Sequence, residues 1–332
     1  MKKFIPVLLF FTLLTFVVAA QDIHFSEFYN TPLQLNPSYT GFFNGDYRLT
    51  AIYRNQWSTI TTPYSTVEGS ADFRILTGRD GRNILGFGLV AFSDKAGDSQ
   101  FSTNEVTASS AFSLATGPDK TNYISGGLSA GFGDASIDLA NLTFDQQWFH
   151  PDQSVSENFA SNSYNYLDFS GGLSWHYIPN KFTNFNIGAA VFHANQPIES
   201  FMDESASTLF RKYVVDASAQ FSISDNLDLY PKAMFDLQGP YSELDFGGLV
   251  RCNLSPGYLK NEGIYFGAFY RWNDGFIVTS RLDLNAISFA LSYDITTSKL
   301  LTASSAQGGP ELSIIYVAKY KSSDKTYFCP RF

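Results

Sequence analysis

The chain has 332 residues, of which 17% are aromatic and only 16% are charged, whereas about 25% of the residues in a typical soluble protein are charged. Its formal net charge of -9, with no basic cluster in the sequence, argues against nucleic acid as a partner. Two cysteines, Cys252 and Cys329, are too few for a disulfide framework. We interpret them as unpaired thiols, although the sequence leaves their pairing open.

Residues 1–20 have the pattern of a signal peptide. Lys2 and Lys3 precede an apolar run over 4–18, which is shorter than the ~20 residues of a membrane-spanning helix. Ala19 and Ala20 supply small residues at a cleavage position, so we expect the mature chain to begin at Gln21 and to leave the cytoplasm. Elsewhere the sequence has no apolar stretch long enough for a spanning helix.

Residues 21–45 are aromatic and interrupted by proline, and they lack the alternation of a barrel strand. Their apolar side chains need burial, which leaves two readings open. The segment either plugs the periplasmic mouth of a barrel formed by the strands that follow, or it docks on a partner protein. The candidate residues of this segment are Phe25, Phe28, Tyr29, Leu33, Asn36, Pro37 and Gly41.

Alternating segments of about ten residues then recur, bounded by Gly, Pro, Asn and Asp. In the first of them, Tyr47, Leu49 and Tyr53 alternate with Arg48 and Arg54. Because successive side chains of a strand point to opposite sides, each segment has one apolar and one polar face. The predicted strands are 46–57, 64–75, 83–93, 103–115, 122–147, 164–177, 183–194, 212–223, 227–238, 242–253, 262–272, 275–283, 286–296 and 310–320.

The segment 122–147 is long enough for two strands, but we interpret it as a single pass. With one pass, the long polar stretches 148–163, 195–211 and 297–309 all fall at one end, and short turns gather at the other. Outer-membrane barrels are built in this way, with an even number of strands. A second strand here would scatter long loops onto both ends.

Mid-strand charges avoid the apolar face, as they must in lipid, where a charge near the midplane costs about 2–4 kcal/mol. A soluble β-sandwich would show the same alternation, but closing some fourteen strands into one sheet removes every unpaired edge. We therefore expect an all-β, transmembrane antiparallel β-barrel of about 14 strands over 46–320, surrounded by outer-membrane lipid. Tyrosines at strand ends are assigned to the interfacial girdles: Tyr64, Tyr123, Tyr164, Tyr213 and Tyr241.

The inward face is predicted to carry charges of both signs. Such a mixture favours pairing across strands and a partly filled interior, whereas a strongly ion-selective pore needs one sign to dominate. We interpret these charges as salt bridges that line the barrel. The lumen candidates are Arg48, Glu68, Asp72, Arg74, Asp168, Asp216 and Arg271.

The sequence offers no strong pattern for catalysis, cofactor binding or metal binding. The four histidines, His24, His150, His176 and His193, are not at metal-ligand spacing from one another. His176 shares a strand face with Ser174, but both side chains would point inward, away from lipid substrates. Histidine in a polar lumen is more often a hydrogen-bonding residue, so we expect neither enzyme activity nor a cofactor.

Three motifs go beyond the general barrel pattern. The segment 21–41 contains Phe-Ser-x-Phe-Tyr followed by Leu-Asn-Pro-Ser, and the chain closes with Cys-Pro-Arg-Phe over 329–332. The first predicted strand ends in Tyr-Arg-Asn-Gln-Trp over 53–57. Together they resemble the PorP/SprF family of type IX secretion system outer-membrane proteins of Bacteroidetes, as does the stretch 142–147. The matching positions at the first strand are Arg54, Asn55, Gln56 and Trp57.

This resemblance implies an outer-membrane barrel without catalytic residues. It implies a role in secretion or surface delivery of cargo with a C-terminal sorting domain, which includes gliding-motility adhesins. The implied partners are that cargo and other type IX secretion components. Whether the chain is a core component of the machine or a cargo-specific paralogue stays open. The alternative function is a passive porin-like channel for small solutes.

Residues 321–332 follow the last predicted strand as a periplasmic tail. The tail is either a loose end or a docking peptide, and docking is slightly favoured because Pro330 prevents regular extension of the strand. The docking candidates are Cys329, Pro330, Arg331 and Phe332.

Overall fold

The computed structural model describes residues 22–57, 62–78, 82–117, 119, 121–139, 161–201, 207–254, 262–298, 301–304 and 306–319. The predicted signal peptide, the motif at 142–147 and the tail at 321–332 with its four docking candidates lie outside these residues. Within the described part of the chain, no helix is both long and apolar enough to cross a membrane.

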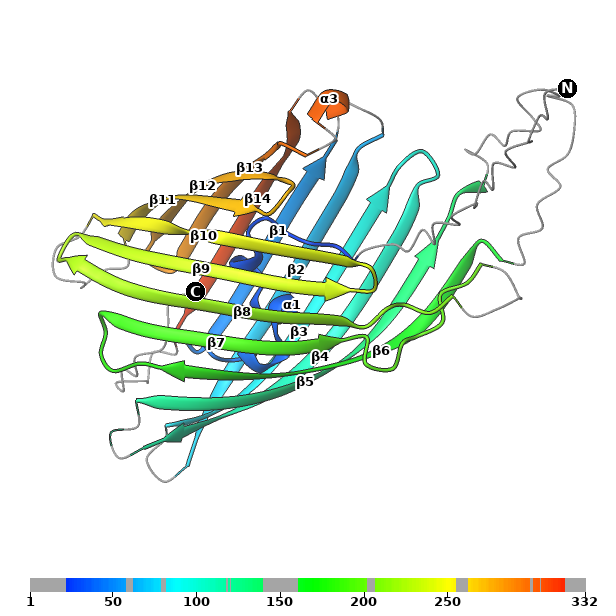
Figure 1. The fold of residues 1–332 in the computed structure, drawn as a ribbon. Helices are drawn as coiled ribbons and strands as arrows, with labels where there is room; N and C mark the ends of the chain where they lie inside the picture. Colours follow the sequence, from blue (N-terminus) through cyan, green and yellow to red (C-terminus); the bar gives the residue numbers. More distant parts are fainter. Residues whose placement is uncertain are drawn as a thin grey trace, which may run out of the picture.

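Fourteen antiparallel strands close into one barrel, in which each strand pairs with its sequence neighbours and β1 pairs with β14 (Figure 1). The predicted fold class and strand number are therefore confirmed. The strands are β1 Tyr47–Gln56, β2 Tyr64–Thr77, β3 Asn83–Ala96, β4 Phe101–Thr116, β5 Asn122–Ser136, β6 Ser163–Tyr177, β7 Thr183–Phe192, β8 Lys212–Ser224, β9 Leu227–Gln238, β10 Tyr241–Asn253, β11 Glu262–Arg271, β12 Gly275–Leu284, β13 Ile287–Thr296 and β14 Gln307–Ala318.

The fifth strand is a single pass, as predicted, but it ends at Ser136 and not at residue 147. Ser136 pairs with Ser102 on β4 and with Ser163 on β6. Both partners lie at or next to the beginning of their strands. Beyond Ser136, the N–H groups of Ile137 and Asp138 still donate to the carbonyls of Asn162 and Ser99, but these acceptors lie outside β6 and β4, so the strand ladder ends at Ser136.

The two faces of the strands differ as the alternation predicts. Leu49 and Leu312 point outward and are 48% and 52% exposed, whereas the inward Arg48 is only 5% exposed. A soluble sandwich would bury the apolar face and expose the charges. Here the apolar side chains form the outer surface and the charges are enclosed, which is the arrangement of a membrane barrel.

The two ends of the barrel are different. At the end where β1 begins and β14 stops, strands are joined by short turns such as 225–226 and 285–286, and we call this the turn end. The opposite end, the loop end, carries the longest connections, 137–162 and 193–211. The connection between β13 and β14 is also at the loop end and contains the short helix α3, Leu301–Ser304.

Residues 22–45, which we call the lumen segment, lie inside the barrel and form η1 Phe28–Asn30, α1 Pro32–Leu35 and η2 Pro37–Tyr39 (Figure 1). The Asp22 carboxylate contacts His193 at the loop end. At the other extreme, the Asp46 N–H donates to the carbonyl of Ala318 at the turn end. The sequence left open a plug at the periplasmic mouth or docking on a partner; in the structure the segment runs the length of the lumen.

Candidate functional site

The lumen segment touches every strand of the barrel. It is therefore attached to the wall around the full circumference of the lumen. One contact on each strand, in order from β1 to β14, is made by Arg54, Asp72, Gly86, Ser109, Gly127, Ser174, Gly188, Asp216, Lys232, Glu243, Phe269, Thr279, Asp294 and Glu311.

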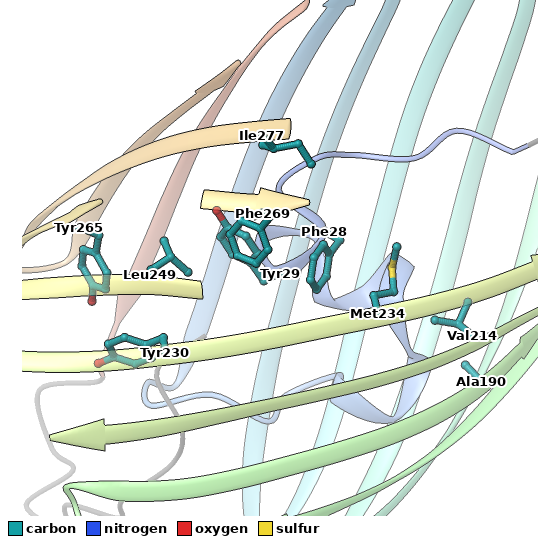
Figure 2. Packing of buried hydrophobic residues seen from close by; sticks show 10 residues of the cluster. All are labelled: Phe28, Tyr29, Ala190, Val214, Tyr230, Met234, Leu249, Tyr265, Phe269 and Ile277. Atoms are coloured by element: carbon teal, nitrogen blue, oxygen red, sulfur yellow. The ribbon is translucent and has the colours of Figure 1, made fainter. Parts of the chain in front are cut away.

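An apolar cluster holds the middle of the lumen segment. Figure 2 shows Phe28 and Tyr29 of the segment against Phe269 of the wall. The rings of Tyr29 and Phe269 stack with centroids 5.3 Å apart, and Phe28 meets Phe269 edge-on at 5.8 Å. Such pairs add about 0.5–1.5 kcal/mol to the stabilisation from burial. The rest of the cluster is Ala190, Val214, Tyr230, Met234, Leu249, Tyr265 and Ile277.

The family-motif residue Arg54 joins the wall to the beginning of the lumen segment. Its guanidinium donates to the carbonyl of His24 and lies 2.9 Å from the Asp294 carboxylate. Glu311 lies 3.8 Å from the same guanidinium and accepts hydrogen bonds from the backbone N–H groups of Ser26 and Glu27 at 2.9 and 2.8 Å. Arg54 is 2% exposed, and its charge allows two buried carboxylates to face the segment.

The other three motif residues mark the end of β1. Asn55 donates to the hydroxyl of Tyr53, and Gln56 is the last residue of the strand. Trp57 adopts a left-handed conformation with φ +53°, and its ring meets Tyr64 edge-on at 4.9 Å. These residues turn the chain at the loop end.

Arg271 is the second cationic centre at the loop end. Its guanidinium lies 3.2 Å from both Glu243 and Asp245 and 3.1 Å from Asp294. It also donates to the Ser26 hydroxyl of the lumen segment. The charges of both signs therefore pair across strands, and part of their hydrogen-bonding capacity is used to hold the segment.

Asn36, Pro37 and Gly41 shape the second half of the lumen segment. The Asn36 side chain accepts from the N–H of Ser38 at 2.9 Å and caps η2, and Pro37 begins that helix. Gly41 has φ +74°, and a Cβ there would lie only 2.6 Å from the Cα of Gly86 on β3. Only glycine fits this close approach between the segment and the wall.

The Gly41 N–H donates to Asp72 at 2.8 Å, and Arg48 holds the same carboxylate through two hydrogen bonds of 2.9 and 2.8 Å. Arg74 donates to the carbonyl of Phe43 at 2.7 Å. These contacts fix the segment near the turn end. All seven lumen candidates are buried inside the wall: Arg48, Glu68, Asp72, Arg74, Asp168, Asp216 and Arg271.

Ser174 and His176 are hydrogen-bonded, with Oγ 2.9 Å from Nε2, and His176 Nδ1 lies 2.7 Å from the Asn186 amide oxygen. The Ser38 hydroxyl donates to Ser174, and the ring of Phe42 stacks on the imidazole at 3.7 Å. His176 is 0% exposed. The lumen segment therefore covers this serine–histidine pair on both sides, and the pair serves as an anchor for the segment.

His193 fastens the beginning of the lumen segment. Its Nε2 lies 2.6 Å from Asp22, and its Nδ1 lies 2.9 Å from Asp168. Burial alone would lower the pKa of His193, but these two carboxylates outweigh burial and raise it to about 10. Although Asp22 is also buried, the positive charges of His193 and Lys212 hold its pKa below the usual range. The pair is thus a charged contact at neutral pH.

Among the described residues, no group of three or more His, Cys, Asp or Glu side chains could hold a metal ion. Cys252 is a free, exposed thiol on β10, and Cys329 lies outside the described residues. The sequence reasoning missed the aromatic side of the lumen around Phe269. The signal was present, because Tyr265 and Phe269 occupy the inward face of a strand whose outward face is also aromatic.

Residues 17–316 match the family model described as "Type IX secretion system membrane protein PorP/SprF". No curated protein matches the chain. The match covers most of the sequence and includes the lumen segment and thirteen complete strands.

The chain is also similar to solved barrels. The CymD monoaromatic hydrocarbon channel is 10% identical, with 88% of this chain and 93% of that chain covered and a TM-score of 0.49. The P. putida toluene transporter TodX is 10% identical, with 86% and 93% covered and a TM-score of 0.49. A Pseudomonas aeruginosa FadL homologue is 9% identical, with 85% and 92% covered and a TM-score of 0.48.

Proposed function

Since the chain belongs to the PorP/SprF family of type IX secretion system membrane proteins, we propose that it is a non-enzymatic outer-membrane component of that system. In this role it supports secretion or surface delivery of cargo with a C-terminal sorting domain, a gliding adhesin being one candidate, through protein–protein contacts. Its partners are the cargo and other components of the machine. The resemblance found in the sequence motifs is confirmed by the family match.

The observation that carries the proposal is a lumen occupied along its length by the chain's own lumen segment. A passive channel needs a continuous water-filled path, but here the chain's own residues 22–45 contact all fourteen strands. Ionic contacts at the loop end and the apolar cluster further down the lumen both hold the segment in place. A barrel with such a segment anchored through its lumen suits a protein that binds other proteins better than it suits a porin.

Outer-membrane barrels have short periplasmic turns and longer extracellular loops. By this rule the turn end of the chain faces the periplasm and the loop end faces the cell surface. The lumen segment then runs from the surface side at Asp22 to the periplasmic side at Asp46. This orientation leaves the loop-end connections available to cargo and the turn end available to periplasmic components.

The test compares surface and culture-fluid proteins with and without the gene, with the wild-type gene restored as the control. We expect proteins with C-terminal sorting domains to be retained in the periplasm. Loss of one or a few would mark a cargo-specific member, and loss of all would mark a core component. Unchanged surface and secreted proteins would contradict the proposal.

The porin alternative is tested on the purified barrel in liposomes. We expect negligible swelling in small sugars for the wild type, because the lumen segment closes the path. Swelling with a clear solute size cutoff, together with normal secretion in the deletion strain, would favour the porin.

A further inference from the structure

A cavity of about 490 Å³ lies at the loop end, between the lumen segment and the wall formed by β3 to β8. Asp22, Ile23 and Leu33 line it from the segment, and Ser207 and Phe210, both exposed, line it from the connection before β8. The volume lies within the range of about 300–1,000 Å³ that is typical of ligand sites. Because Ser207 and Phe210 both line the cavity and are exposed, the cavity is accessible from outside the barrel.

The cavity has an excess of negative charge. Its lining includes one lysine, Lys212, and one histidine, His193, and both are already paired. His193 lies between two of the carboxylates, and Lys212 lies 3.6 Å from Asp236, which is outside the lining. The lining carboxylates are Asp22, Asp94, Glu105, Asp168 and Glu199.

Three of these carboxylates have hydroxyl groups as their partners among the described residues. The Thr66 hydroxyl donates to Asp94 at 2.6 Å. Thr107 donates to Glu105 at 2.6 Å and Tyr166 donates to its other oxygen at 3.2 Å. Tyr164 hydrogen-bonds to Glu199. Hydroxyl groups orient a carboxylate but do not neutralise it. The cations that act on these three groups, Arg54 on Asp94 and His193 on the two glutamates, already pair with other carboxylates, so the three groups favour a further cation in the cavity.

Aromatic rings form much of the remaining wall. Phe201 packs edge-on against Tyr164 at 4.8 Å and against Phe101 at 6.2 Å. The faces and edges of such rings accept apolar groups, and their faces also attract cations. The other lining aromatic residues are Phe92, Tyr166, Phe192 and Phe210.

We propose that this cavity binds an arginine side chain together with a neighbouring apolar side chain from a polypeptide segment that reaches the loop end. The guanidinium fits because its planar fork pairs with carboxylates and its face stacks on aromatic rings, which an ammonium does less well. The choice of a polypeptide rests on the proposed function, in which the loop end meets secreted protein. The binding chemistry itself stands on the cavity alone.

The experiment uses the full chain in nanodiscs and a fluorescent probe peptide with the central sequence Phe-Arg-Phe. We expect saturable binding that weakens with added salt, because the attraction is partly ionic. Replacing the arginine with citrulline, which has nearly the same shape and no charge, should weaken binding by about tenfold, and lysine should fall in between.

Two variants test whether the peptide binds in the cavity. Glu105→Gln, whose side-chain oxygen can still accept from Thr107, and Glu199→Gln in the connection after β7 should each weaken binding about fivefold. Asp225→Asn removes one negative charge from an exposed turn at the opposite end and should leave binding unchanged. Because Glu199 is outside the strands, its substitution tests the site even where Glu105→Gln disturbs barrel folding.

Equal affinity for the arginine and citrulline peptides would overturn the proposal, as would the absence of peptide binding. Competition by phenethylammonium at concentrations equal to those of the peptide would also overturn it, in favour of a site for small organic cations. Failure of the proposed function looks different. It would leave peptide binding intact while the deletion strain secretes normally.

Discussion

The Asp22 carboxylate lies 2.6 Å from Nε2 of His193, although 171 positions separate the two residues. This contact joins the first described residue of the chain to the loop end of the barrel. Because Asp46 is bonded to the last residue of β14 at the turn end, the contact fixes the direction in which the lumen segment runs. Changes at His193 should therefore act on the closure of the lumen.

Alkaline pH should loosen the lumen segment. Burial lowers the pKa of His193, but Asp22 and Asp168 raise it to about 10 overall, above its usual value of ~6.5. Its contribution is therefore complete below pH ~6.5 and is lost as the pH rises through about 10. Burial, with the nearby charge of Asp22, raises the pKa of Glu199 to about 7. As the pH rises, Glu199 ionises and repels Asp22, which also loosens the lumen segment.

Asp22 has a lowered pKa, so its contribution is present above pH ~3.8 and is lost as the pH falls toward the lowered value. Docking should therefore be tightest between about pH 4 and 6.5. We expect the loss by pH 10 to be about 4 kcal/mol, measured as more frequent openings in single-channel recordings. His193→Gln should remove most of the slope above pH 6.5. A wild-type slope that survives this substitution would contradict the assignment.

Arg54→Ala should lower the free energy of unfolding by about 3 kcal/mol, because it removes the cation paired with the buried Glu311 and leaves Asp294 with Arg271 alone. Arg54→Lys should recover part of this loss, since a lysine keeps the charge without the guanidinium fork. The measurement is urea unfolding of the purified barrel. Arg211→Ala removes an exposed arginine and should change stability by less than about 1 kcal/mol. Equal stability of the Arg54→Ala variant and the wild type would rule out this role.

The barrel could be predicted from the sequence because apolar and polar residues alternate along each strand with the face on which they lie. Leu49 and Arg48 are neighbours in the sequence, but Leu49 is exposed on the outer surface and Arg48 is buried in the lumen. The residue types alone therefore distinguish the two faces. The ends of the strands were predicted less accurately. β5 ends at Ser136, which pairs with residues at or next to the beginnings of β4 and β6. The end of a strand depends on the register of other strands, which no single segment encodes.

The path of the lumen segment could not be predicted, because residues 22–45 have no period that relates them to particular strands. The environments of the strand-end tyrosines could not be predicted from the sequence either. Tyr123 was assigned to a membrane girdle, but it is 6% exposed and packs inside against Phe42, and Tyr164 lines the loop-end cavity. A tyrosine suits both an interface and a filled lumen, and only the position of the segment decides between them.

Gly127→Ala should open the lumen without unfolding the barrel. A Cβ on Gly127 would overlap the carbonyl of Pro37 and lie 2.6 Å from the backbone nitrogen of Ser38. Relieving this overlap displaces the segment at a cost of about 1–3 kcal/mol. We expect a larger open fraction in single-channel recordings. The matched control is Gly69→Ala on β2, where a Cβ has nothing within 4 Å. Equal conductance of the two variants would contradict the prediction.

Ser174→Ala and His176→Gln should lower the stability of the protein, and we expect no hydrolase activity that these substitutions could remove. Both residues hold the lumen segment through Ser38 and Phe42, so each substitution should cost about 1–2 kcal/mol. Hydrolysis of phospholipids and p-nitrophenyl esters by the purified wild type should not exceed the buffer rate. Wild-type hydrolysis that disappears in the Ser174→Ala variant would show that the pair is catalytic.

Deleting residues 22–40 should leave an inserted barrel that conducts ions. The strands pair with one another all the way round, and their apolar outer face meets lipid without help from the segment. Inward charges such as Asp72 keep their wall partner, Arg48, and the remaining polar groups gain water in place of the segment. The measurement is heat-modified mobility on gels together with bilayer conductance, and added peptide 22–40 should reduce the current again. An unfolded, degraded product would show instead that the segment is part of the folding core.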